Sequence, residues 1–249
     1  MPTPDRWSPF DRHWAAVLGV PEATLRGAGV TTVPHARLGD WRGVWIWVRH
    51  ACAVVSVPAD WAETVARSLR SATASSVHDP SLPEALFGDD VDTTIGPTFL
   101  GAVTAERFVS APSDSVRPLE PSDGPAIEVF RSAIEAQQWQ HGAIDLRPGA
   151  ARGEIMAAFD DGQILAMAAM REDAPGVCDP GVVTHPQARG RGLGRAVVSA
   201  VTERALGRGE VVLYQTLEAN LPAVALARRL GYERYARNIA IRLRNPAVA

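Results

Sequence analysis

Residues 182–196 read VVTHPQARGRGLGRA, and this stretch indicates the fold around it. The apolar run Gly181–Thr184 predicts a short buried strand, and the pattern of Leu193–Leu206 predicts a helix. The loop between them therefore leads from the end of a strand into the start of a helix. Such a loop exposes the first amides of the helix to a ligand.

Three glycines occupy alternating positions in this loop, and three arginines flank them. The glycines are Gly190, Gly192 and Gly194, and the arginines are Arg189, Arg191 and Arg195. Glycine lets backbone amides approach a ligand closely, and a helix N-terminus adds free N–H donors and the positive end of its dipole. The combination predicts a pyrophosphate site. Tight packing of the helix on the strand is the alternative role of the glycines.

Three kinds of phosphate-binding loop compete for this stretch. A Walker loop needs lysine followed by serine or threonine after the last glycine, and the sequence here is Arg-Ala. A dinucleotide fingerprint needs a different glycine spacing and an acid at the end of the next strand, whereas Glu210 begins its strand. The acyl-CoA pattern, Gln/Arg-x-x-Gly-x-Gly/Ala, is matched in full by Arg189-x-x-Gly192-x-Gly194.

The sequence here resembles the GNAT superfamily of acyl-CoA-dependent N-acyltransferases. Val183–Pro186 is similar to that family's strand, which ends in a proline just before the loop. Downstream, Asn220–Tyr232 resembles its second signature, in which an asparagine precedes a helix that closes with glycine and an aromatic residue. The resemblance covers about Val116–Leu243, roughly half of the chain.

The resemblance implies a binding role for three sets of residues. The backbone of Val182, Val183 and Thr184 would pair with the pantetheine arm of acetyl-CoA, as an added strand does. Asn220 would contact the cofactor near its thiol, or cap the following helix. The pyrophosphate would be held by the loop, whose residues are Arg189, Gly190, Arg191, Gly192, Leu193, Gly194 and Arg195.

Catalytic groups are harder to transfer from the family. Its general acid is often a tyrosine in the second signature, and the matching position here is Ala227. Tyr232 stands where the family's aromatic residue usually packs. The family's base is often a carboxylate near the start of the central strand, which makes Asp179 a candidate; the alternative is that Asp179-Pro180 forms only a turn.

A second candidate cluster follows the first helix of this half, in the region that borders the acceptor in the family. Its members are Glu135, Trp139, His141 and Asp145. Histidine titrates near neutral pH and can accept a proton from an amine, which makes His141 a candidate catalytic residue. We expect Trp139 and Glu135 to bind the acceptor. A solvated loop histidine is the alternative for His141.

Composition excludes several classes of protein. The formal net charge of the 249 residues is -3 and no basic run occurs, so nucleic acid is not an expected partner. The chain contains no lysine, which excludes a lysine nucleophile. The two cysteines show no metal-binding or disulfide spacing, so we expect no metal. With no signal peptide or membrane-spanning run, we expect a soluble, cytoplasmic protein.

The proline- and serine-rich stretch 109–125 predicts a boundary between two domains. We expect an N-terminal α/β domain over residues 1–112, of unknown role, and a GNAT-like domain over 113–249. In the first, residues 44–50 and 52–57 predict a β-hairpin. Its tryptophans indicate an aromatic core rather than a ligand platform.

In the second half, strands and helices alternate. Pro125–Gln138 predicts a helix, and the Asp-Asp-Gly at 160–162 predicts a hairpin between residues 154–159 and 163–170. Further elements are expected at Val116–Leu119, Val211–Thr216, Leu221–Leu230 and Asn238–Leu243. The resemblance implies a mixed, largely antiparallel sheet flanked by helices, an α/β (α+β) fold.

The resemblance thus predicts an N-acetyltransferase that moves an acetyl or short acyl group from acetyl-CoA to an amine. The acceptor is a small-molecule amine or a peptide N-terminus. A non-catalytic acyl-CoA-binding regulatory module is the alternative, because alanine stands at the usual acid position. A non-enzymatic interaction protein is a second alternative, which requires exposed tryptophans. The acceptor and the oligomeric state do not follow from the sequence.

Overall fold

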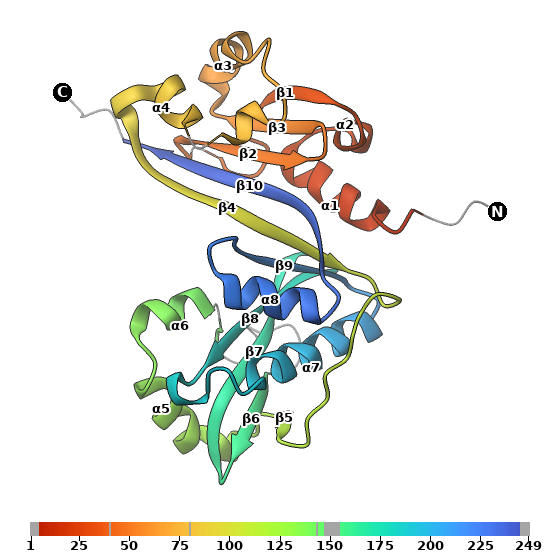
Figure 1. The fold of residues 1–249 in the computed structure, drawn as a ribbon, viewed down its shortest axis with the longest axis vertical. Helices are drawn as coiled ribbons and strands as arrows, with labels where there is room; N and C mark the ends of the chain where they lie inside the picture. Colours follow the sequence, from red (N-terminus) through yellow and green to blue (C-terminus); the bar gives the residue numbers. More distant parts are fainter. Residues whose placement is uncertain (1–4, 40, 80, 143, 147–154, 245–249) are drawn as a thin grey trace. The chain divides into compact units, whose positions relative to one another are not determined.

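The computed structural model describes residues 5–39, 41–79, 81–142, 144–146 and 155–244, apart from the side chains of residues 83–85 and 141. The chain forms two compact units (Figure 1). Unit 1 contains residues 1–100, 216–221 and 234–249, and unit 2 contains residues 101–215 and 222–233. Each unit has a sheet covered by helices.

Unit 1 is built on the strand order β1-β3-β2-β10-β4. The expected hairpin is confirmed, because β2 and β3 pair antiparallel on either side of His50, whose φ is 51°. β10 pairs antiparallel with β2. The elements are α1 (Ser8–Leu18), α2 (Glu22–Arg26), β1 (Gly29–Pro34), β2 (Gly43–Arg49), β3 (Cys52–Val57), α3 (Ala62–Ser68), α4 (Leu82–Phe87), β4 (Val91–Val103) and β10 (Glu233–Leu243).

Unit 2 has the strand order β9-β8-β7-β6-β5, in which only β8 and β9 are parallel. The largely antiparallel mixed sheet is therefore confirmed. The elements are β5 (Val116–Pro118), α5 (Gly124–Ser132), α6 (Ala136–Gly142), β6 (Met156–Asp160), β7 (Gln163–Ala174), β8 (Val177–Thr184), the 3-10 turn η5 (Pro186–Ala188), α7 (Leu193–Gly207), β9 (Val211–Leu217) and α8 (Leu221–Arg229).

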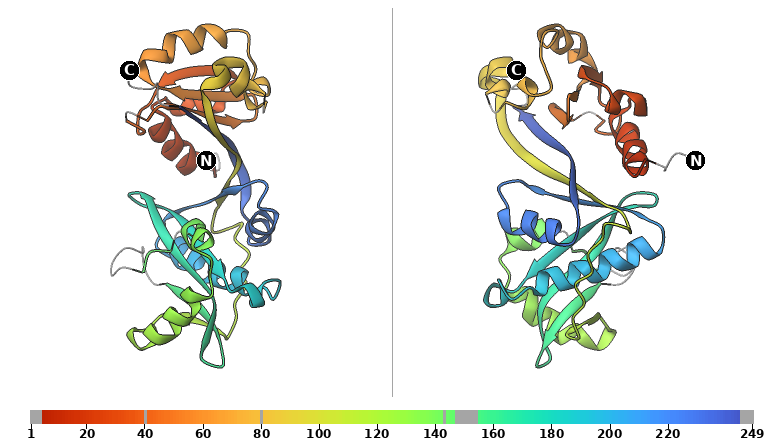
Figure 2. Two further views of the ribbon diagram at one scale, coloured as in Figure 1. Left: turned by 90° about the vertical axis from the view of Figure 1, so that its left-hand side faces the viewer. Right: turned by 45° about the vertical axis from the view of Figure 1, so that its right-hand side comes forward.

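The sheet of unit 2 is covered on both faces. A Cβ at Gly142 of α6 would overlap the Val183 side chain, whereas a Cβ at Gly194 of α7 would lie 2.8 Å from Thr184 Oγ1. Because successive strand residues point to opposite faces, α6 and α7 lie on opposite sides of β8 (Figures 1 and 2). β7, the neighbour of β8 in the sheet, is buried from Ala166 to Met170.

Two expectations differ from the structure. The helix expected at 125–138 is two helices, because the chain tightens at Ala133 and Ile134, whose amides donate to the carbonyls of residues three positions earlier. Ile134 is buried in the core at this break. The division of the chain also differs from a single boundary at residue 112, because β10 pairs with β2 and groups with unit 1.

The second hairpin is confirmed at its expected turn. Asp161 and Gly162 have φ values of 46° and 74°, as a tight two-residue turn between β6 and β7 requires. Both cysteines, Cys52 and Cys178, are free and buried. None of the helices within the described ranges is long and apolar enough to cross a membrane.

Candidate functional site

The glycine loop joins η5 to α7 and has the backbone shape that glycine requires. Gly190 and Gly192 have φ values of 79° and 83°, a region that side chains rarely allow. A Cβ at either position would meet nothing within 4 Å, so the loop borders open space. The Ala196 amide donates to the Gly192 carbonyl as the first bond of α7. The amides before it, from 192 to 195, have no partner within the helix.

Gly194 has a different role from the other two glycines. The Cβ of any larger residue would lie 2.8 Å from Thr184 Oγ1 and 3.6 Å from Leu226 Cδ1. Gly194 therefore lets the first turn of α7 approach β8. The packing role therefore applies to Gly194, whereas Gly190 and Gly192 border open space.

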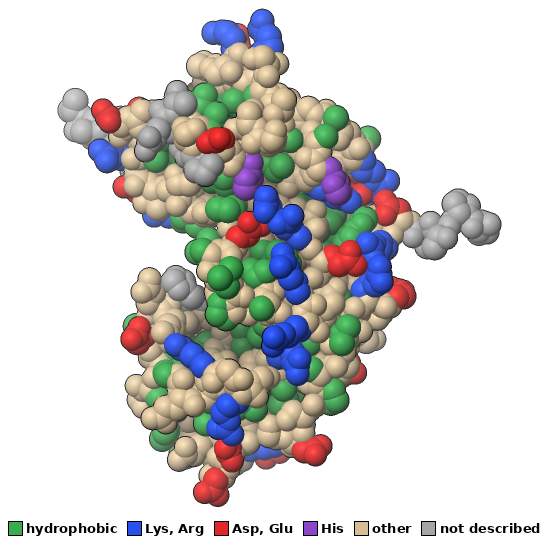
Figure 3. Space-filling model, viewed as in Figure 1, with side chains coloured by type: hydrophobic (Ala, Val, Ile, Leu, Met, Phe, Trp, Pro, Cys, Tyr) green, Lys and Arg blue, Asp and Glu red, His purple; other side chains and the backbone are tan. Residues whose placement is uncertain are grey.

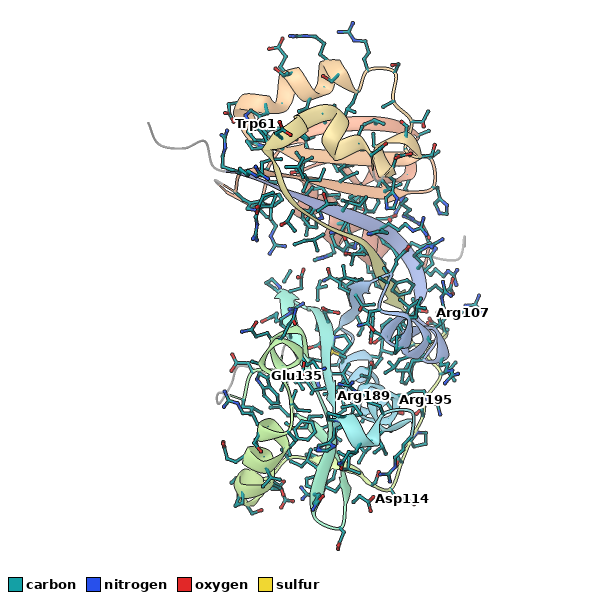
Figure 4. The ribbon with its side chains drawn as sticks, turned by 60° about the vertical axis from the view of Figure 1, so that its left-hand side comes forward. Trp61, Arg107, Asp114, Glu135, Arg189 and Arg195 are labelled. Atoms are coloured by element: carbon teal, nitrogen blue, oxygen red, sulfur yellow. The ribbon has the colours of Figure 1, made fainter. Side chains whose placement is uncertain are left out.

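The three arginines of the loop differ in their partners. Arg189 donates to Gln138 Oε1 of α6 at 2.7 Å, and Arg191 pairs with Asp160 Oδ2 at 3.0 Å. Arg195 is exposed and forms no ion pair with any residue that the structure describes. Figure 4 shows Arg189 in the loop and Arg195 in the first turn of α7, and Figure 3 shows basic side chains gathered over α7 and α8. The positive charge needed beside a pyrophosphate is present.

β8 has an unpaired edge next to the loop. Its pairs with β7 continue to Thr184, whereas its pairs with β9 are Val177–Val211 and Cys178–Val212. β9 continues to Leu217, so the two parallel strands separate after these pairs. Within the described part of the chain, no strand pairs with this edge of β8 beyond Cys178. Its free N–H and C=O groups can bind an extended ligand.

Asp179 lies where β8 and β9 separate. It is a residue of β8, so the alternative that Asp179-Pro180 forms only a turn is wrong. Its Oδ1 accepts the Gln215 amide of β9 at 3.0 Å, and its Oδ2 pairs with Arg171 Nη2 of β7 at 2.7 Å. Burial raises the pKa of Asp179 to about 6, although Arg171 opposes the shift. A carboxylate with this pKa can take up and release a proton near neutral pH.

Ala227, at the position of the family's usual acid, and Tyr232 are both buried. Ala227 is buried in α8. Tyr232 is 2% exposed, and its hydroxyl is hydrogen-bonded to Thr202 Oγ1 at 2.7 Å. Burial raises the pKa of Tyr232 well above its ordinary value. Tyr232 is therefore a packing residue, as its place after Gly231 predicts.

A pocket of about 580 Å³ opens beside α6, within unit 2. Trp139 lines it and packs edge-on against Phe130 at 6.4 Å between ring centroids. Glu135 is exposed and is not among the lining residues. The lining consists of Arg131, Trp139, Gln140, Ile144, Asp145, Leu146 and Arg171.

Three other residues from the sequence analysis are His141, Asn220 and His185. The backbone of His141 lies in α6, but its side chain is outside the described residues. Asn220 is exposed, immediately before α8, and groups with unit 1. His185 Nδ1 accepts the Gln187 amide at 3.3 Å and caps η5. No cluster of described residues could hold a metal ion.

Sequence reasoning did not find Arg171 and Gln215. Arg171 connects the pocket to Asp179, since it lines the first and pairs with the second. An arginine near the end of a predicted strand has no signal of its own, and Gln215 acts through its backbone amide. Only the pairing of strands identifies both residues.

Residues 122–232 match a family model, which is that of the "Acetyltransferase (GNAT) family". The match includes the glycine loop, Asp179 and the pocket residues. A search of curated proteins found no match.

One solved structure supports the fold, and two others are similar over part of the chain. A GCN5-related N-acetyltransferase from Kribbella flavida is 20% identical, with a TM-score of 0.52 and 96% coverage of both chains. An acetyltransferase from the GNAT family of Colwellia psychrerythraea is 18% identical with a TM-score of 0.49, covering 65% of this chain and 61% of its own. A GNAT family acetyltransferase from Brucella melitensis, solved with acetyl-CoA, is 20% identical with a TM-score of 0.39, covering 54% and 90%.

Proposed function

Because residues 122–232 match the model of the acetyltransferase (GNAT) family, we propose that the protein transfers an acetyl or short acyl group from acetyl-CoA to an amine. The observation that carries the proposal is the glycine loop. Gly190 and Gly192 face open space with left-handed backbones, directly before the free amides of α7.

The residues present fit the pyrophosphate of CoA. In this proposal the amides of Gly190 and of residues 192–195 donate to it, because those within the first turn of α7 have no partner in the helix, whereas the Arg191 amide donates to the Ala188 carbonyl. Arg195 adds a charge that no ion pair with a described residue offsets, and Arg189 borders the same loop. The pair between Arg191 and Asp160 is exposed, so an anion can compete for Arg191 at little cost.

The unpaired edge of β8 fits the pantetheine arm. Val182, Val183 and Thr184 would hydrogen-bond to the arm through their backbones, as strands do when a peptide is added to a sheet. The strands separate at Asp179, so the thiol end of the arm would lie near this residue.

When bound, acetyl-CoA supplies an activated acyl group as a thioester. In our proposal Asp179 accepts the proton of the acceptor amine, for which its pKa of about 6 is suited, as the new C–N bond replaces the C–S bond of the thioester. CoA would leave as a thiolate that takes its proton from water, since alanine stands at the family's usual acid position. Arg171 and the Gln215 amide hold the carboxylate in place. In this proposal Trp139 forms a wall of the acceptor pocket, and the neighbouring Glu135 contacts the acceptor.

The test combines binding with turnover. Acetyl-CoA is offered with a panel of small amines and peptides, and released thiol is followed. Gly192→Val should abolish CoA binding in calorimetry, because a branched side chain would fill the space beside the loop. Gly176→Val is the matched control, since it imposes similar backbone strain, at φ 76°, in the turn at the other end of β8.

The outcomes separate the two functional classes. CoA binding that Gly192→Val removes and Gly176→Val retains, together with thiol release, supports the enzyme. CoA binding without transfer to any amine would favour a non-catalytic acyl-CoA-binding module. Unchanged affinity in Gly192→Val would contradict the proposed CoA site.

A further inference from the structure

The pocket beside α6 has an unusual combination of walls. One wall is apolar and comes from Trp139, Ile144 and Leu146. Three charged residues also line it: Arg131 from the last turn of α5, Arg171 from β7, and Asp145. Its volume of about 580 Å³ lies within the usual range of small-molecule sites, roughly 300–1,000 Å³.

The two guanidinium groups are held in place by their neighbours. The Arg131 guanidinium lies 5.7 Å from the centre of the Trp139 ring, and it forms no ion pair with any side chain in the described part of the protein. Arg171 uses Nη2 to bind Asp179, yet its side chain is 50% exposed. An arginine has five N–H donors, so Arg171 retains donors for a second anion.

An amine that carries no anionic group would make no favourable contact with these arginines. A cation near Arg131 and Arg171 would be repelled, unless the same molecule also carried an anion for them. A carboxylate matches the planar fork of a guanidinium, and the Trp139 wall suits a hydrocarbon or aromatic side chain. Arg171 also binds the carboxylate that we propose as the base, so a ligand held by Arg171 would lie near that base.

We infer that the acceptor is an amine that also carries a carboxylate and an apolar side chain, as a free amino acid does. Arg131 binds the carboxylate of the acceptor, Arg171 donates a further hydrogen bond to that carboxylate, and Trp139 contacts the side chain of the acceptor. The inference rests on the proposed function, because it names the acceptor of the same site. A peptide N-terminus, which lacks a carboxylate beside its amine, is disfavoured.

The experiment uses the full-length protein with acetyl-CoA and compares L-phenylalanine with L-phenylalaninamide, in which a neutral amide replaces the carboxylate. Released thiol gives kcat and KM. We expect kcat/KM to be about 10- to 100-fold higher for phenylalanine, as expected for hydrogen bonds to a charged group. Arg131→Gln should remove most of this preference by raising KM at similar kcat, and should leave the amide unaffected. Arg67→Gln, at an exposed position of unit 1, is the control.

The outcomes distinguish failure of the inference from failure of the proposed function. Equal transfer to both compounds would overturn the inference but would still support the proposed acyltransferase. Faster transfer to 2-aminoethyl phosphate than to phenylalanine would have the same meaning. A preference that Arg131→Gln leaves intact overturns the assignment to this pocket. If no amine is acylated, the proposed function fails, and calorimetry with the same two compounds tests the pocket alone: binding of phenylalanine but not of its amide, lost in Arg131→Gln, supports recognition of the carboxylate there, and its absence overturns it.

Discussion

Asp179 combines a buried carboxylate with two fixed hydrogen-bond partners. Asp179→Asn keeps the shape but cannot accept a proton. We expect kcat/KM at pH 7.5 to fall by about 10²- to 10⁴-fold, the usual contribution of a general base. In the unaltered protein, kcat/KM should also fall as the pH drops below about 6, because the carboxylate becomes protonated. A pH–rate profile checks both. A variant with full activity and the same acidic limb would exclude Asp179 as the base.

The same pKa shift predicts an effect on stability. The pKa of about 6 in the folded protein exceeds the ordinary value of 3.8, so the folded state binds this proton more tightly. This stabilisation is complete below about pH 4 and is lost as the pH rises through about 6. Relative to Asp179→Asn, the free energy of unfolding of the unaltered protein should therefore decrease by roughly 2–3 kcal/mol from pH 4 to 7. Urea denaturation of both proteins at several pH values measures it.

We predict that the hydroxyl of Tyr232 is not needed for turnover. Tyr232→Phe removes its hydrogen bond to Thr202 and should lower the free energy of unfolding by about 1–3 kcal/mol, because a buried hydroxyl loses its partner. Turnover should stay within a few-fold of the unaltered protein. Denaturation and steady-state kinetics test the two effects separately. A loss of turnover of a hundredfold or more would show that the hydroxyl acts as the general acid.

At the scale of elements, the contact between α7 and β8 depends on one glycine. Gly194→Ala would place a Cβ 2.8 Å from Thr184 Oγ1, so it should destabilise the protein by about 1–3 kcal/mol through overpacking. It should also weaken CoA binding, because the first turn of α7 must move.

A second substitution tests the cause. Thr184→Ala removes the hydroxyl that the new Cβ would meet, so the double variant should recover part of the stability lost in Gly194→Ala. A double-mutant cycle by chemical denaturation would show favourable coupling of about 0.5–3 kcal/mol. Additive effects of the two substitutions would indicate that Gly194→Ala acts elsewhere.

At the scale of the whole molecule, the chain returns to unit 1 after completing unit 2. β10 pairs with β2, and its Tyr235 hydroxyl donates to the buried Asp11 of α1 at 2.5 Å. A fragment of residues 113–249 therefore leaves β10 without these partners and with an exposed strand edge, which promotes aggregation.

We expect this fragment to aggregate or to unfold at a lower temperature than the full chain. Circular dichroism melting and light scattering, with the full chain as control, would show it. A monomeric fragment with an unchanged melting temperature and CoA affinity would mean that residues 113–249 form an independent domain after all.

Several features could be predicted from the sequence because they depend on neighbours along the chain. The two hairpins follow from strand patterns on either side of a short turn, and α7 follows from a helical pattern that begins among glycines. The loop Arg189-x-x-Gly192-x-Gly194 indicated the GNAT family, to whose model residues 122–232 match. In contrast, β4 was not predicted, because its exposed residues and its internal Gly96-Pro97 do not resemble a strand.

Only the tertiary structure decided what surrounds the candidate site. Asp179 meets Gln215, 36 residues away, and Arg189 meets Gln138, 51 residues away. It also decided that α5 and α6 are separate helices and that β10 groups with unit 1. The physical reason is the range of the interactions. Backbone preferences and side-chain periodicity act over a few residues, whereas partners across a sheet and the burial that raises the pKa of Asp179 exist only after distant segments have packed together.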